Sequence, residues 1–480
     1  MKILFVAAEM SPLAKVGGLA DVTGSLPQAL IGLGHDVRVM IPQYGTIDFS
    51  RYPLTPVEGK FKVPIMGNNE LANLNLTMIK DKVPVYTIEN QKYFGGDKVY
   101  GENDLERFLF FSRAVFEILP ELEWQPEIVH CHDWHTALAV MWLKRHLNLK
   151  KVVFTIHNLA YQGAFDEAFL VKSELKSCWM DSRSGALEPP LNFLSQGILW
   201  ADLVTTVSKT YSQEILTPQY GEGLDALLRL RYRQRDFVGI VNGIDYEEYN
   251  PETDPHIEAN YNSKTVEKRI VNKLALQKRA GLPQDAGIPL FGMVQRLDEQ
   301  KGLDLLEKAA ELLLADSHVQ LVVLGKGREH YEDMLSHIAT RYPQKVALFA
   351  AFDNSLAHLI YAACDLFLMP SRFEPCGLGQ LIAMRYGALP LVRHTGGLVD
   401  TVPEFTPNLE KGNGFVFREY TPEALATAFK QGVKAFNNQE AWHQVIRRVM
   451  KLDFSWRASA RKYETFYASR FWDTSQAKKE

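Results

Sequence analysis

Short apolar runs rich in β-branched residues alternate along the chain with stretches of helical periodicity. In the first half the predicted strands are residues 2–8, 36–42, 83–88, 127–131, 152–157 and 202–208. In the second half they are residues 237–241, 289–295, 319–325, 346–350, 365–370 and 389–392. Helical patterns separate them, among others over 19–34, 106–119, 302–316 and 356–364. This alternation predicts parallel sheets covered by helices on both faces, and its two halves predict an α/β fold of two Rossmann-like domains.

The boundary between the halves is predicted from a local change in composition. The stretch "VNGIDYEEYNPETD" is rich in Gly, Asn, Pro and acidic residues after an apolar run, which is typical of a hinge. We expect one domain over residues 1–245 and a second over 246–454. Residues 43–100 contain short alternating segments with many Pro, Gly and Asn, which predict an antiparallel insertion. A final helix over about residues 455–475 carries aromatic side chains at helical spacing and needs a surface to cover.

Bulk composition excludes several classes of protein. The net charge of −4 lacks the basic excess of a dedicated nucleic-acid binder. The N-terminal apolar run is cut short by Glu9, and no stretch approaches the roughly 18 apolar residues that indicate a membrane span. The cysteines are scattered, so neither a disulfide framework nor a zinc ribbon is indicated: Cys131, Cys178, Cys364 and Cys376. We expect a soluble cytoplasmic protein.

The sequence Gly-Gly-Leu-x-Asp occurs twice, in "KVGGLAD" at 15–21 and in "HTGGLVD" at 394–400. Each copy follows an apolar run and precedes an amphipathic stretch, the pattern of a strand that turns into a helix. Glycine allows the backbone to approach a ligand closely, and a helix start offers N–H groups to an anion. The alternative is that both copies are ordinary tight βα turns.

Polar and charged residues follow the predicted strands in both halves. Ligands of open α/β sheets bind beyond the carboxyl ends of the strands, so these residues mark candidate sites. They include Glu9, Lys15, Asp133, His157 and Asn158 in the first half, and Arg296, Lys301, Glu374, Gly396 and Gly397 in the second. Two such edges that face each other would form a cleft between the domains.

Two loops of the second half suggest a phosphate and a sugar. In "QRLDEQKG", Arg296 and Lys301 suit a diphosphate, although a solvated loop with two surface cations is the alternative. In "SRFEPCGLGQ", Glu374 could accept hydrogen bonds from sugar hydroxyls, and the alternative is an acid that caps a helix. No Walker A motif and no G-x-S-x-G elbow is present.

The cluster "HCHDWH" suggests either a metal site or a sugar site. His130 and His132 lie on one side of a strand, but His135 lies beyond a turn and no fourth ligand is evident. We therefore predict no metal here. Asp133 and Trp134 are better suited to line a sugar site, because sugars stack on aromatic faces and bond to carboxylates.

Several motifs together resemble those of one enzyme family. "KVGGLAD", "HDWH", "IHNLAYQG", "VNGID", "QRLDEQKG", "SRFEPCGLGQ" and "HTGGLVD" are similar, in order, to motifs of bacterial glycogen synthases and plant starch synthases, over about residues 1–470. The resemblance implies two Rossmann-like domains that face each other across a cleft, the GT-B type. It implies transfer of glucose from ADP-glucose to the non-reducing end of an α-1,4-glucan with retention of configuration. The first domain would serve the acceptor and the second the donor, and the final helix would pack back on the first domain.

The same resemblance implies roles for individual residues. The catalytic set would be Lys15, His157, Arg296, Lys301 and Glu374. Donor-binding residues would be Gly18, Asp21, Asn242, Phe352, Cys376, Gly377, Leu378, Thr395, Gly396, Gly397 and Leu398. Acceptor-binding residues would be Glu9, Asp133, Trp134 and Asn158. Within these sets, the amides of the second GGL copy would receive donor oxygens, and Phe352 would stack on adenine.

The chain departs from the family pattern in two places. Val16 stands where many members have Thr, which leaves the lysine and the glycines in place. Ile382 stands where an E-x7-E motif would have its second Glu, and Gln380 is expected to contact the donor instead. Without a second carboxylate, we expect a front-face reaction in which a phosphate oxygen helps to deprotonate the acceptor hydroxyl.

No metal and no pyridoxal phosphate is expected as a cofactor, since side-chain cations would stabilise the leaving diphosphate. The expected partners are ADP-glucose and an α-1,4-glucan, with neither nucleic acid nor membrane. Preference for ADP-glucose over UDP-glucose, oligomeric state and association with polysaccharide granules stay open. Alternatives are a sucrose-type synthase that uses UDP-glucose, a phosphorylase with pyridoxal phosphate, and a non-catalytic glucan-binding scaffold.

Overall fold

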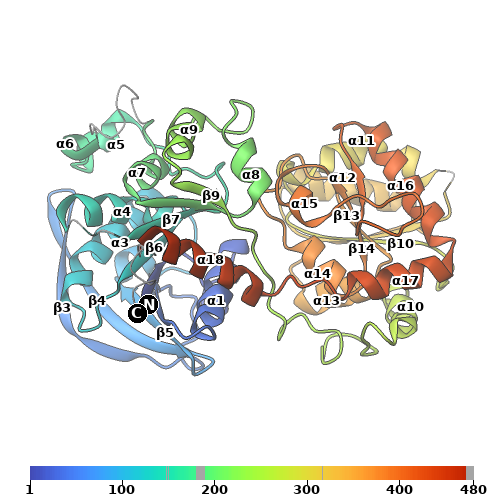
Figure 1. Ribbon diagram of the computed structural model, residues 1–480, viewed down its shortest axis with the longest axis horizontal. Helices are drawn as coiled ribbons and strands as arrows, with labels where there is room; N and C mark the ends of the chain where they lie inside the picture. The colour runs from blue at the N-terminus through green and yellow to red at the C-terminus, as the bar shows by residue number, and fades with distance from the viewer. Residues whose placement is uncertain (148, 150, 180–189, 316, 472–480) are drawn as a thin grey trace, which may run out of the picture. The chain divides into compact units, whose positions relative to one another are not determined.

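The computed structural model describes residues 1–147, 149, 151–179, 190–315 and 317–471. The chain forms two compact units, Met1–Asn242 with Trp456–Glu480, and Gly243–Ser455 (Figure 1). Each unit has its own hydrophobic core, built on the buried strands of its own sheet. We describe each unit by itself.

The first unit is built on a nine-stranded sheet in the order β3-β4-β5-β2-β1-β6-β7-β8-β9. Its central strands are mostly apolar, because helices cover both faces; in β7 every residue is buried. The strands are β1 (Lys2–Val6), β2 (Asp36–Pro42), β3 (Thr55–Ile65), β4 (Asn68–Ile79), β5 (Val83–Glu89), β6 (Ile128–His132), β7 (Val152–Ile156), β8 (Leu203–Thr206) and β9 (Phe237–Gly239).

Two features of this sheet bear on the sequence predictions. The antiparallel insertion predicted within residues 43–100 is confirmed, because β4 pairs antiparallel with both β3 and β5. The turn between β3 and β4 is tight, with φ of 49° at Met66 and 73° at Gly67. The assignment of residues 237–241 to the second half is wrong, since β9 pairs with β8 in the first sheet. A strand of three residues is too short for its sequence to indicate which sheet it joins.

Helices of the first unit flank this sheet (Figure 1). They are α1 (Gly18–Ile31), α2 (Gln91–Phe94), α3 (Asp104–Ile118), α4 (Trp134–His146), α5 (Glu167–Lys172), α6 (Lys176–Trp179), α7 (Phe193–Trp200), α8 (Lys209–Glu214), α9 (Asp225–Arg233) and α18 (Trp456–Phe471). The last helix packs against α1 and buries Trp456, Tyr463 and Tyr467 in the core of this unit. Its aromatic side chains therefore have the surface that their spacing requires.

The second unit contains a six-stranded parallel sheet in the order β12-β11-β10-β13-β14-β15. Its strands are β10 (Leu290–Val294), β11 (Gln320–Leu324), β12 (Val346–Phe349), β13 (Leu366–Met369), β14 (Leu389–Arg393) and β15 (Phe415–Phe417). Its helices are α10 (Arg269–Arg279), α11 (Leu303–Leu314), α12 (Glu329–Arg341), α13 (Asn354–Ala363), α14 (Gly379–Arg385), α15 (Gly396–Thr401), α16 (Pro422–Phe436) and α17 (Gln439–Val449).

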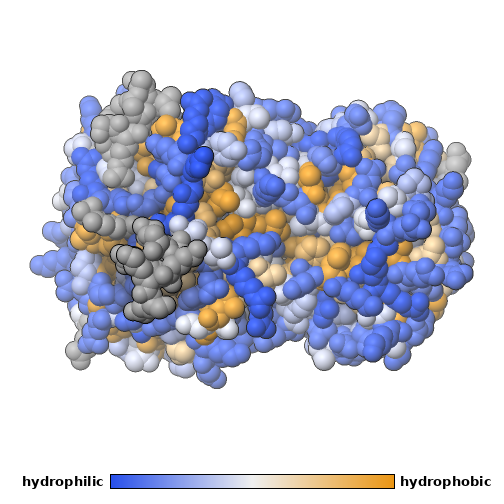
Figure 2. Space-filling model, viewed as in Figure 1, coloured by the Kyte–Doolittle hydropathy of each residue, from blue (hydrophilic) through white to orange (hydrophobic). Residues whose placement is uncertain are grey.

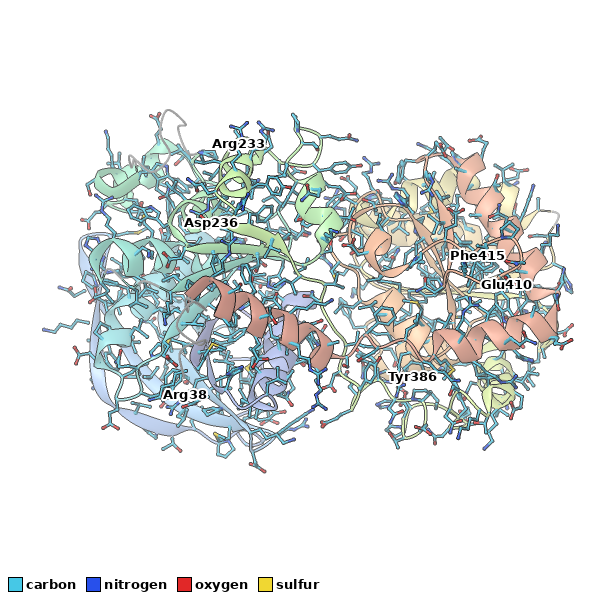
Figure 3. All side chains as sticks on the ribbon, in the orientation of Figure 1. Arg38, Arg233, Asp236, Tyr386, Glu410 and Phe415 are labelled. Atoms are coloured by element: carbon cyan, nitrogen blue, oxygen red, sulfur yellow. The ribbon has the colours of Figure 1, made fainter. Side chains whose placement is uncertain are left out.

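Buried polar contacts attach the segment before α10 to this unit. The hydroxyl of Tyr386, labelled in Figure 3, donates to Asp254 Oδ2, and the same carboxylate oxygen lies 2.7 Å from His358 Nδ1. Tyr261 donates from its hydroxyl to the carbonyl of Tyr386. The segment that opens the second unit is thus held by side chains of α13 and by the end of α14.

The visible face of each unit is mostly hydrophilic, with smaller apolar patches (Figure 2). Exposed large apolar side chains include Val16, Tyr161 and Phe352, all near ends of strands or their loops. Among the described residues, no helix has both the length and the apolar character that crossing a bilayer requires.

Candidate active site

Both sheets reverse their strand order at one point. In the first unit the chain moves outward from β1 through β2 on one side and from β6 through β7 on the other. In the second unit the corresponding pair is β10 and β13. Ligands of open α/β sheets bind beyond the carboxyl ends of the strands at such a switch point. The loops after β1, β6, β10 and β13 are therefore the first places to look for a site.

The loop after β1 is organised by one buried carboxylate, that of Glu9, which is 3% exposed. Its Oε2 accepts hydrogen bonds from the backbone N–H groups of Val16 at 2.7 Å and Gly17 at 2.8 Å. Its Oε1 accepts from the hydroxyl of Tyr100 at 2.5 Å. These contacts hold the loop that leads into α1. They also mean that the Val16 and Gly17 amides, at this helix start, already have an anionic partner.

Lys15 and Asp21 form an ion pair at the start of α1, with Nζ 2.6 Å from Oδ1. The lysine side chain is 41% exposed, so the pair lies in contact with solvent. Gly18 is the first residue of the helix. An open cavity of about 450 Å³ adjoins this loop and is lined by Leu13, Ala14, Lys15, Val16, Thr46, Asp97, Lys98, Val99 and Tyr100.

Asp133 follows β6 in a strained conformation, with φ of 55° and ψ of 179°. Its Oδ1 accepts from the backbone N–H of His157 at 2.7 Å, which joins the ends of β6 and β7. Burial raises the pKa of Asp133 from 3.8 to about 7, the nearby charge of Glu9 acts in the same direction, and the hydrogen bond from His157 opposes both. This hydrogen bond from His157 compensates for the backbone strain at Asp133.

Trp134, predicted to line a sugar site together with Asp133, has little exposed ring surface. Its ring is only 7% exposed and packs against Phe108 and Phe193. A Cβ on Gly163 would lie 2.2 Å from the ring, so the backbone of the segment after β7 covers it. The ring is therefore part of the packed interior at the end of the sheet. A role for Trp134 toward the acceptor stays a prediction.

His157 and Asn158 follow β7 directly and are half-buried. The Nε2 of His157 lies 3.0 Å from Nδ1 of His132, whose ring stacks on that of His130. Burial lowers the pKa of His157 to about 3, so its ring is neutral at neutral pH. His135 lies apart, between Tyr100 and Trp134. No group of three potential metal-ligating side chains is found within the described part of the chain.

In the second unit, the loop after β10 meets the loop after β13 through a buried ion pair. Lys301 Nζ lies 2.7 Å from Oε2 and 3.0 Å from Oε1 of Glu374. The carboxylate is 4% exposed and also accepts from the hydroxyl of Ser371 at 2.9 Å. A charge buried this deeply needs such partners, because desolvation is expensive. The two predicted catalytic residues thus lie in direct contact.

Arg296 lies on the same loop, with Nη2 3.5 Å from Oδ2 of Asp298. The other oxygen of Asp298 and the amide nitrogen of Gln295 are buried without a hydrogen-bond partner among the described residues. Such groups are rare in folded proteins and mark places where a ligand can complete the hydrogen bonding. Polar atoms at this strand end are therefore available for recognition.

Most of the predicted donor-binding residues of the second unit come together around the start of α15. A Cβ on Gly397 would lie 2.2 Å from the carbonyl oxygen of Cys376, and Gly397 N donates to the carbonyl of Glu374 at 2.9 Å. Positive φ angles of 73° at Gly377 and 48° at Gly396 allow this close approach. The gathered residues are Cys376, Gly377, Leu378, Thr395, Gly396, Gly397 and Leu398.

Backbone hydrogen bonds in this region already use some of the amides that were expected to receive donor oxygens. Gly397 N–H and Leu398 N–H already donate to carbonyl groups of Glu374 and Thr395. Gln380, expected to contact the donor, donates from Nε2 to the carbonyl groups of Cys376 and Gly377, and its Oε1 is buried without a partner among the described residues. That carbonyl oxygen is the atom of Gln380 still available to a ligand.

The other predicted donor-binding residues lie elsewhere: Gly18, Asp21 and Asn242 belong to the first unit, and Phe352 lies apart from this group in the second. Phe352 follows β12, separated from β13 in the sheet by β11 and β10, and is 81% exposed. Asn242 is the last residue of the first unit and is 6% exposed, with its Oδ1 unpartnered among the described residues.

The structure also gives contacts to two residues for which the sequence predicted no role, Tyr100 and Ser371. Tyr100 lies in the inserted region, far along the chain from the Glu9 that it contacts, so no spacing rule could connect them. Ser371 lies three positions before Glu374 and bonds to its carboxylate. The short spacing was visible in "SRFEPCGLGQ", and a polar residue directly after a strand was the available signal.

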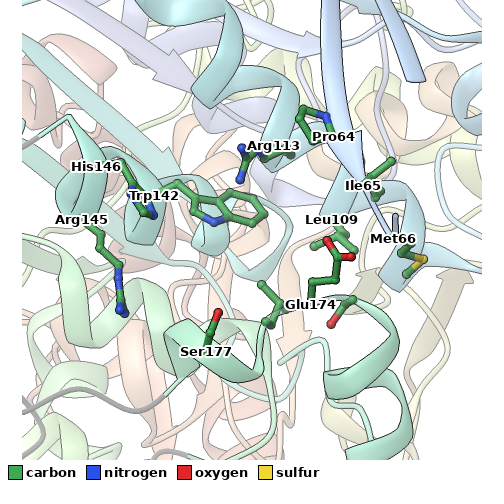
Figure 4. Close-up of a pocket in the computed structure, with 12 residues that line it drawn as sticks. Pro64, Ile65, Met66, Leu109, Arg113, Trp142, Arg145, His146, Glu174 and Ser177 are labelled. Carbon is green, nitrogen blue, oxygen red and sulfur yellow. The ribbon is translucent and has the colours of Figure 1, made fainter. Parts of the chain in front are cut away.

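A second cavity, of about 380 Å³, lies away from these residues (Figure 4). Its lining includes Trp142, Arg145 and His146 at the C-terminal end of α4, together with Arg113 of α3. Asp133 and Trp134 lie at the opposite end of α4, roughly 18 Å away along a helix that rises about 1.5 Å per residue. This cavity is therefore separate from the candidate active site.

Comparison with known proteins agrees with this geometry. A profile of the starch synthase catalytic domain matches residues 2–230, and a profile of glycosyl transferases group 1 matches residues 276–451. The chain is 44% identical to a glycogen synthase of Desulforamulus reducens, covering 97% of this chain and 98% of that protein. It is 45% identical to a glycogen synthase of Geotalea daltonii, again covering 97% and 98%.

Solved structures give the same picture. The catalytic domain of starch synthase IV from Arabidopsis thaliana, bound to ADP and acarbose, is 35% identical and superposes with a TM-score of 0.87 over 98% of this chain and 99% of that one. A sucrose-phosphate synthase from Thermosynechococcus elongatus, 16% identical, shares the fold with a TM-score of 0.60 over 98% and 99% of the two chains. The two-domain α/β fold is therefore the GT-B type. The chain belongs to the glycogen and starch synthase family of glycosyltransferases.

Proposed function

We propose that this chain transfers glucose from ADP-glucose to the non-reducing end of an α-1,4-glucan, with retention of configuration. Membership of the family supports transfer of glucose in glycogen or starch synthesis. The relative of known structure that binds ADP and acarbose supports both a nucleotide donor and a glucan acceptor. The observation that carries the proposal is the contact between Lys301 and Glu374 at the switch point of the second sheet.

That contact places side by side the two groups that a nucleotide-sugar donor requires, a cation for the diphosphate and a carboxylate for the sugar hydroxyls. Departure of ADP leaves negative charge on the diphosphate, and a positioned cation lowers the barrier to that step. Lys301 is such a cation, and Arg296 on the same loop is a second one with the geometry to hold a phosphate by two hydrogen bonds. Glu374, buried beside the lysine, is suited to accept hydrogen bonds from the hydroxyls of the glucose.

The remaining roles in the second unit concern the rest of the donor. We propose that Gln380 Oε1 and the backbone around Cys376, Gly377 and Leu378 contact it, together with the start of α15 at Thr395, Gly396, Gly397 and Leu398. Phe352, with its ring open to solvent, is proposed to stack on adenine. Asn242, the last residue of the first unit, is proposed to contribute its carbonyl oxygen, which has no partner among the described residues.

In the first unit, the end of the sheet is proposed to serve the acceptor and the reacting sugar. Lys15, which pairs with Asp21, is proposed to contact donor phosphate. Glu9 then acts by holding the loop that carries Lys15, since its described contacts go to that loop and to Tyr100. Asp133, Trp134, His157 and Asn158 are proposed to line the region of the reacting sugar and the acceptor.

The chemistry we propose needs no second carboxylate beside the anomeric carbon. Ile382, on α14, supplies none at the position where a double displacement would require it. We propose a front-face reaction, in which a leaving phosphate oxygen accepts the proton of the attacking glucan hydroxyl on the same face of the sugar. Side-chain cations and not a metal ion are proposed to stabilise the diphosphate, and the protein is proposed to act in the cytoplasm.

The test compares donors and then a matched pair of lysines. Radiolabelled ADP-glucose or UDP-glucose is incubated with the full chain and glycogen, and label in the polymer is counted. We expect incorporation from ADP-glucose; incorporation from UDP-glucose alone would favour the sucrose-type alternative, and none from either donor would favour a non-catalytic scaffold.

Lys301→Ala is expected to lower kcat by on the order of 10²–10³, because the transition state loses a cation at the leaving group. Lys308→Ala is the control, since Lys308 is an exposed lysine of the helix that follows. Thermal unfolding of both variants checks that the fold survives, since Glu374 loses its buried partner. Full kcat in a folded Lys301→Ala protein would refute the role of this lysine.

A further inference from the structure

His132, the last residue of β6, is held in one orientation by its neighbours. Its ring stacks on Phe5 with 5.2 Å between centroids and an interplanar angle of 19°, and on His130 with 4.3 Å and 26°. Its Nδ1 lies 3.0 Å from Nε2 of His157, at the end of the adjacent strand β7. A ring turned by 180° would keep both stacking contacts but would place a carbon instead of Nδ1 opposite His157, so the contact with His157 selects this orientation.

The His132–His157 contact requires one nitrogen to donate and the other to accept. Burial lowers the pKa of both rings, to about 3 at His157 and well below the usual value at His132, so each is neutral and carries a single ring proton. Either His132 donates from Nδ1 and carries no proton on Nε2, or His157 donates from Nε2 and His132 carries its proton on Nε2. In the first arrangement Nδ1 of His157 carries a proton and can donate, and in the second it carries none and can only accept.

The surroundings of His132 Nε2 distinguish these arrangements. This nitrogen is buried and has no hydrogen-bond partner among the residues that the structure describes. An N–H at this position would be a buried donor without an acceptor, and orphaned buried donors are rarer in proteins than unsatisfied acceptors. We therefore propose that His132 donates from Nδ1 to Nε2 of His157, so that His157 carries its proton on Nδ1.

The consequence for His157 concerns what it can do to a ligand. The Nδ1–H makes it a hydrogen-bond donor toward an oxygen atom, and the ring has no lone pair left on that side to act as a general base. This inference deepens the proposed function, on which its substrate rests: His157 donates to a hydroxyl oxygen of the transferred hexose. The acceptor hydroxyl must then lose its proton elsewhere, as a front-face reaction requires. His132 is a positioning residue that acts through His157.

The proton is located directly by NMR spectroscopy of the full chain labelled with 15N in histidine. Spectra that correlate the ring carbon-bound protons with both ring nitrogens distinguish a protonated from an unprotonated nitrogen. Signals of His157 are assigned by their loss in His157→Gln. We expect Nδ1 protonated and Nε2 unprotonated; a proton on Nε2 overturns the proposal. The NMR measurement needs no enzymatic activity, so its result does not depend on whether the proposed function is correct.

Two variants test the positioning role. In His132→Asn the side-chain amide can still donate from near the Nδ1 position, whereas His132→Phe keeps a stacked ring and removes the donor. We expect His132→Phe to place part of the His157 proton on Nε2 and to lower kcat about tenfold with little change in KM for glucan, the value of one correctly directed hydrogen bond. His132→Asn should restore most of both.

The control is His135→Asn, since His135 is also buried but its ring packs between Tyr100 and Trp134 instead of against His132 or His157. It should leave the His157 proton on Nδ1. Equal losses in His132→Asn and His132→Phe, with no change in the His157 spectrum, would contradict positioning. If His132→Phe does not fold, the spectrum of the unaltered chain decides.

Discussion

Asp133 combines three features that rarely occur together in one residue: a positive φ, burial and a raised pKa. Its carboxylate holds the backbone N–H of His157, and that contact fixes the start of the segment after β7. The position is therefore costly to the fold and useful to the site, the combination expected where geometry serves chemistry.

The raised pKa predicts a specific pH dependence of stability. The folded chain keeps the Asp133 proton up to about pH 7, whereas the unfolded chain loses it near pH 4, so this group lowers stability as pH rises through that interval. Asp133→Asn keeps an oxygen that can accept from His157 but cannot ionise. Between pH 5 and pH 8 the variant should gain on the order of 3 kcal/mol relative to the unaltered chain, measured by denaturant unfolding. Parallel pH profiles would contradict this.

The two GGL copies give a second prediction at the same scale. A Cβ on Gly397 would lie 2.2 Å from the Cys376 carbonyl oxygen, whereas a Cβ on Gly17 meets nothing within 4 Å. Gly397→Ala should therefore destabilise the protein by about 1–3 kcal/mol through forced backbone shifts. Gly17→Ala, with an ordinary φ of −140°, should change stability by less than about 0.5 kcal/mol. Thermal unfolding of the two variants side by side makes the comparison.

At the scale of elements, most strands could be predicted from the sequence. A strand that is buried on both faces needs apolar side chains at successive positions, and it therefore appears as a continuous apolar run. Residues 152–157 and 389–392 are examples, since β7 spans Val152–Ile156 and β14 spans Leu389–Arg393. What failed was short or non-local. β15 has only three residues and was not predicted, and β9 was assigned to the wrong half, because sheet membership depends on pairing with distant residues.

The site shows the same division between local and distant information. Polar residues after strands and paired glycines predicted where candidate residues lie along the sheet edge. The contact between Lys301 and Glu374 joins residues 73 positions apart, and the burial of Trp134 depends on a glycine after another strand. Neither can be deduced from spacing.

The helix α18 supplies a prediction about one element. Tyr467 Oη lies 2.7 Å from Nδ1 of the buried His130, which links the last helix to β6. Tyr467→Phe should destabilise the protein by about 1–3 kcal/mol, because it leaves a buried ring nitrogen without its partner. The control is Thr465→Ala at an exposed position of the same helix, expected to change stability by less than about 0.5 kcal/mol. Chemical denaturation gives both values, and equal effects would contradict the link.

At the scale of the whole molecule, two separate cores predict unfolding in more than one step. The first core contains α18 and the nine-stranded sheet, and the second contains the six-stranded sheet. Multidomain proteins commonly depart from two-state unfolding. Differential scanning calorimetry should show at least two transitions, in contrast to a single one for a chain with one core.

ADP should raise the transition of the second unit more than that of the first, because most of the proposed donor-binding residues lie in the second unit. At a concentration of about 100 times its Kd, a ligand stabilises the state that it binds by about 2.7 kcal/mol. Limited proteolysis before and after the first transition identifies which unit has unfolded. An equal shift of every transition, or none, would contradict the assignment of ADP to this unit.

The outermost strand of the nine-stranded sheet has a consequence for how copies of the chain behave toward one another. Among the described strands β3 pairs only with β4, so one side of its backbone has no described strand beside it. Exposed Pro56 and Pro64 cannot donate there, exposed Lys60 and Lys62 repel an approaching lysine-rich edge, and an irregularity between Val57 and Lys60 bends the strand. This long edge strand is therefore poorly suited to pair with the edge strand of another copy, and so to start a fibril.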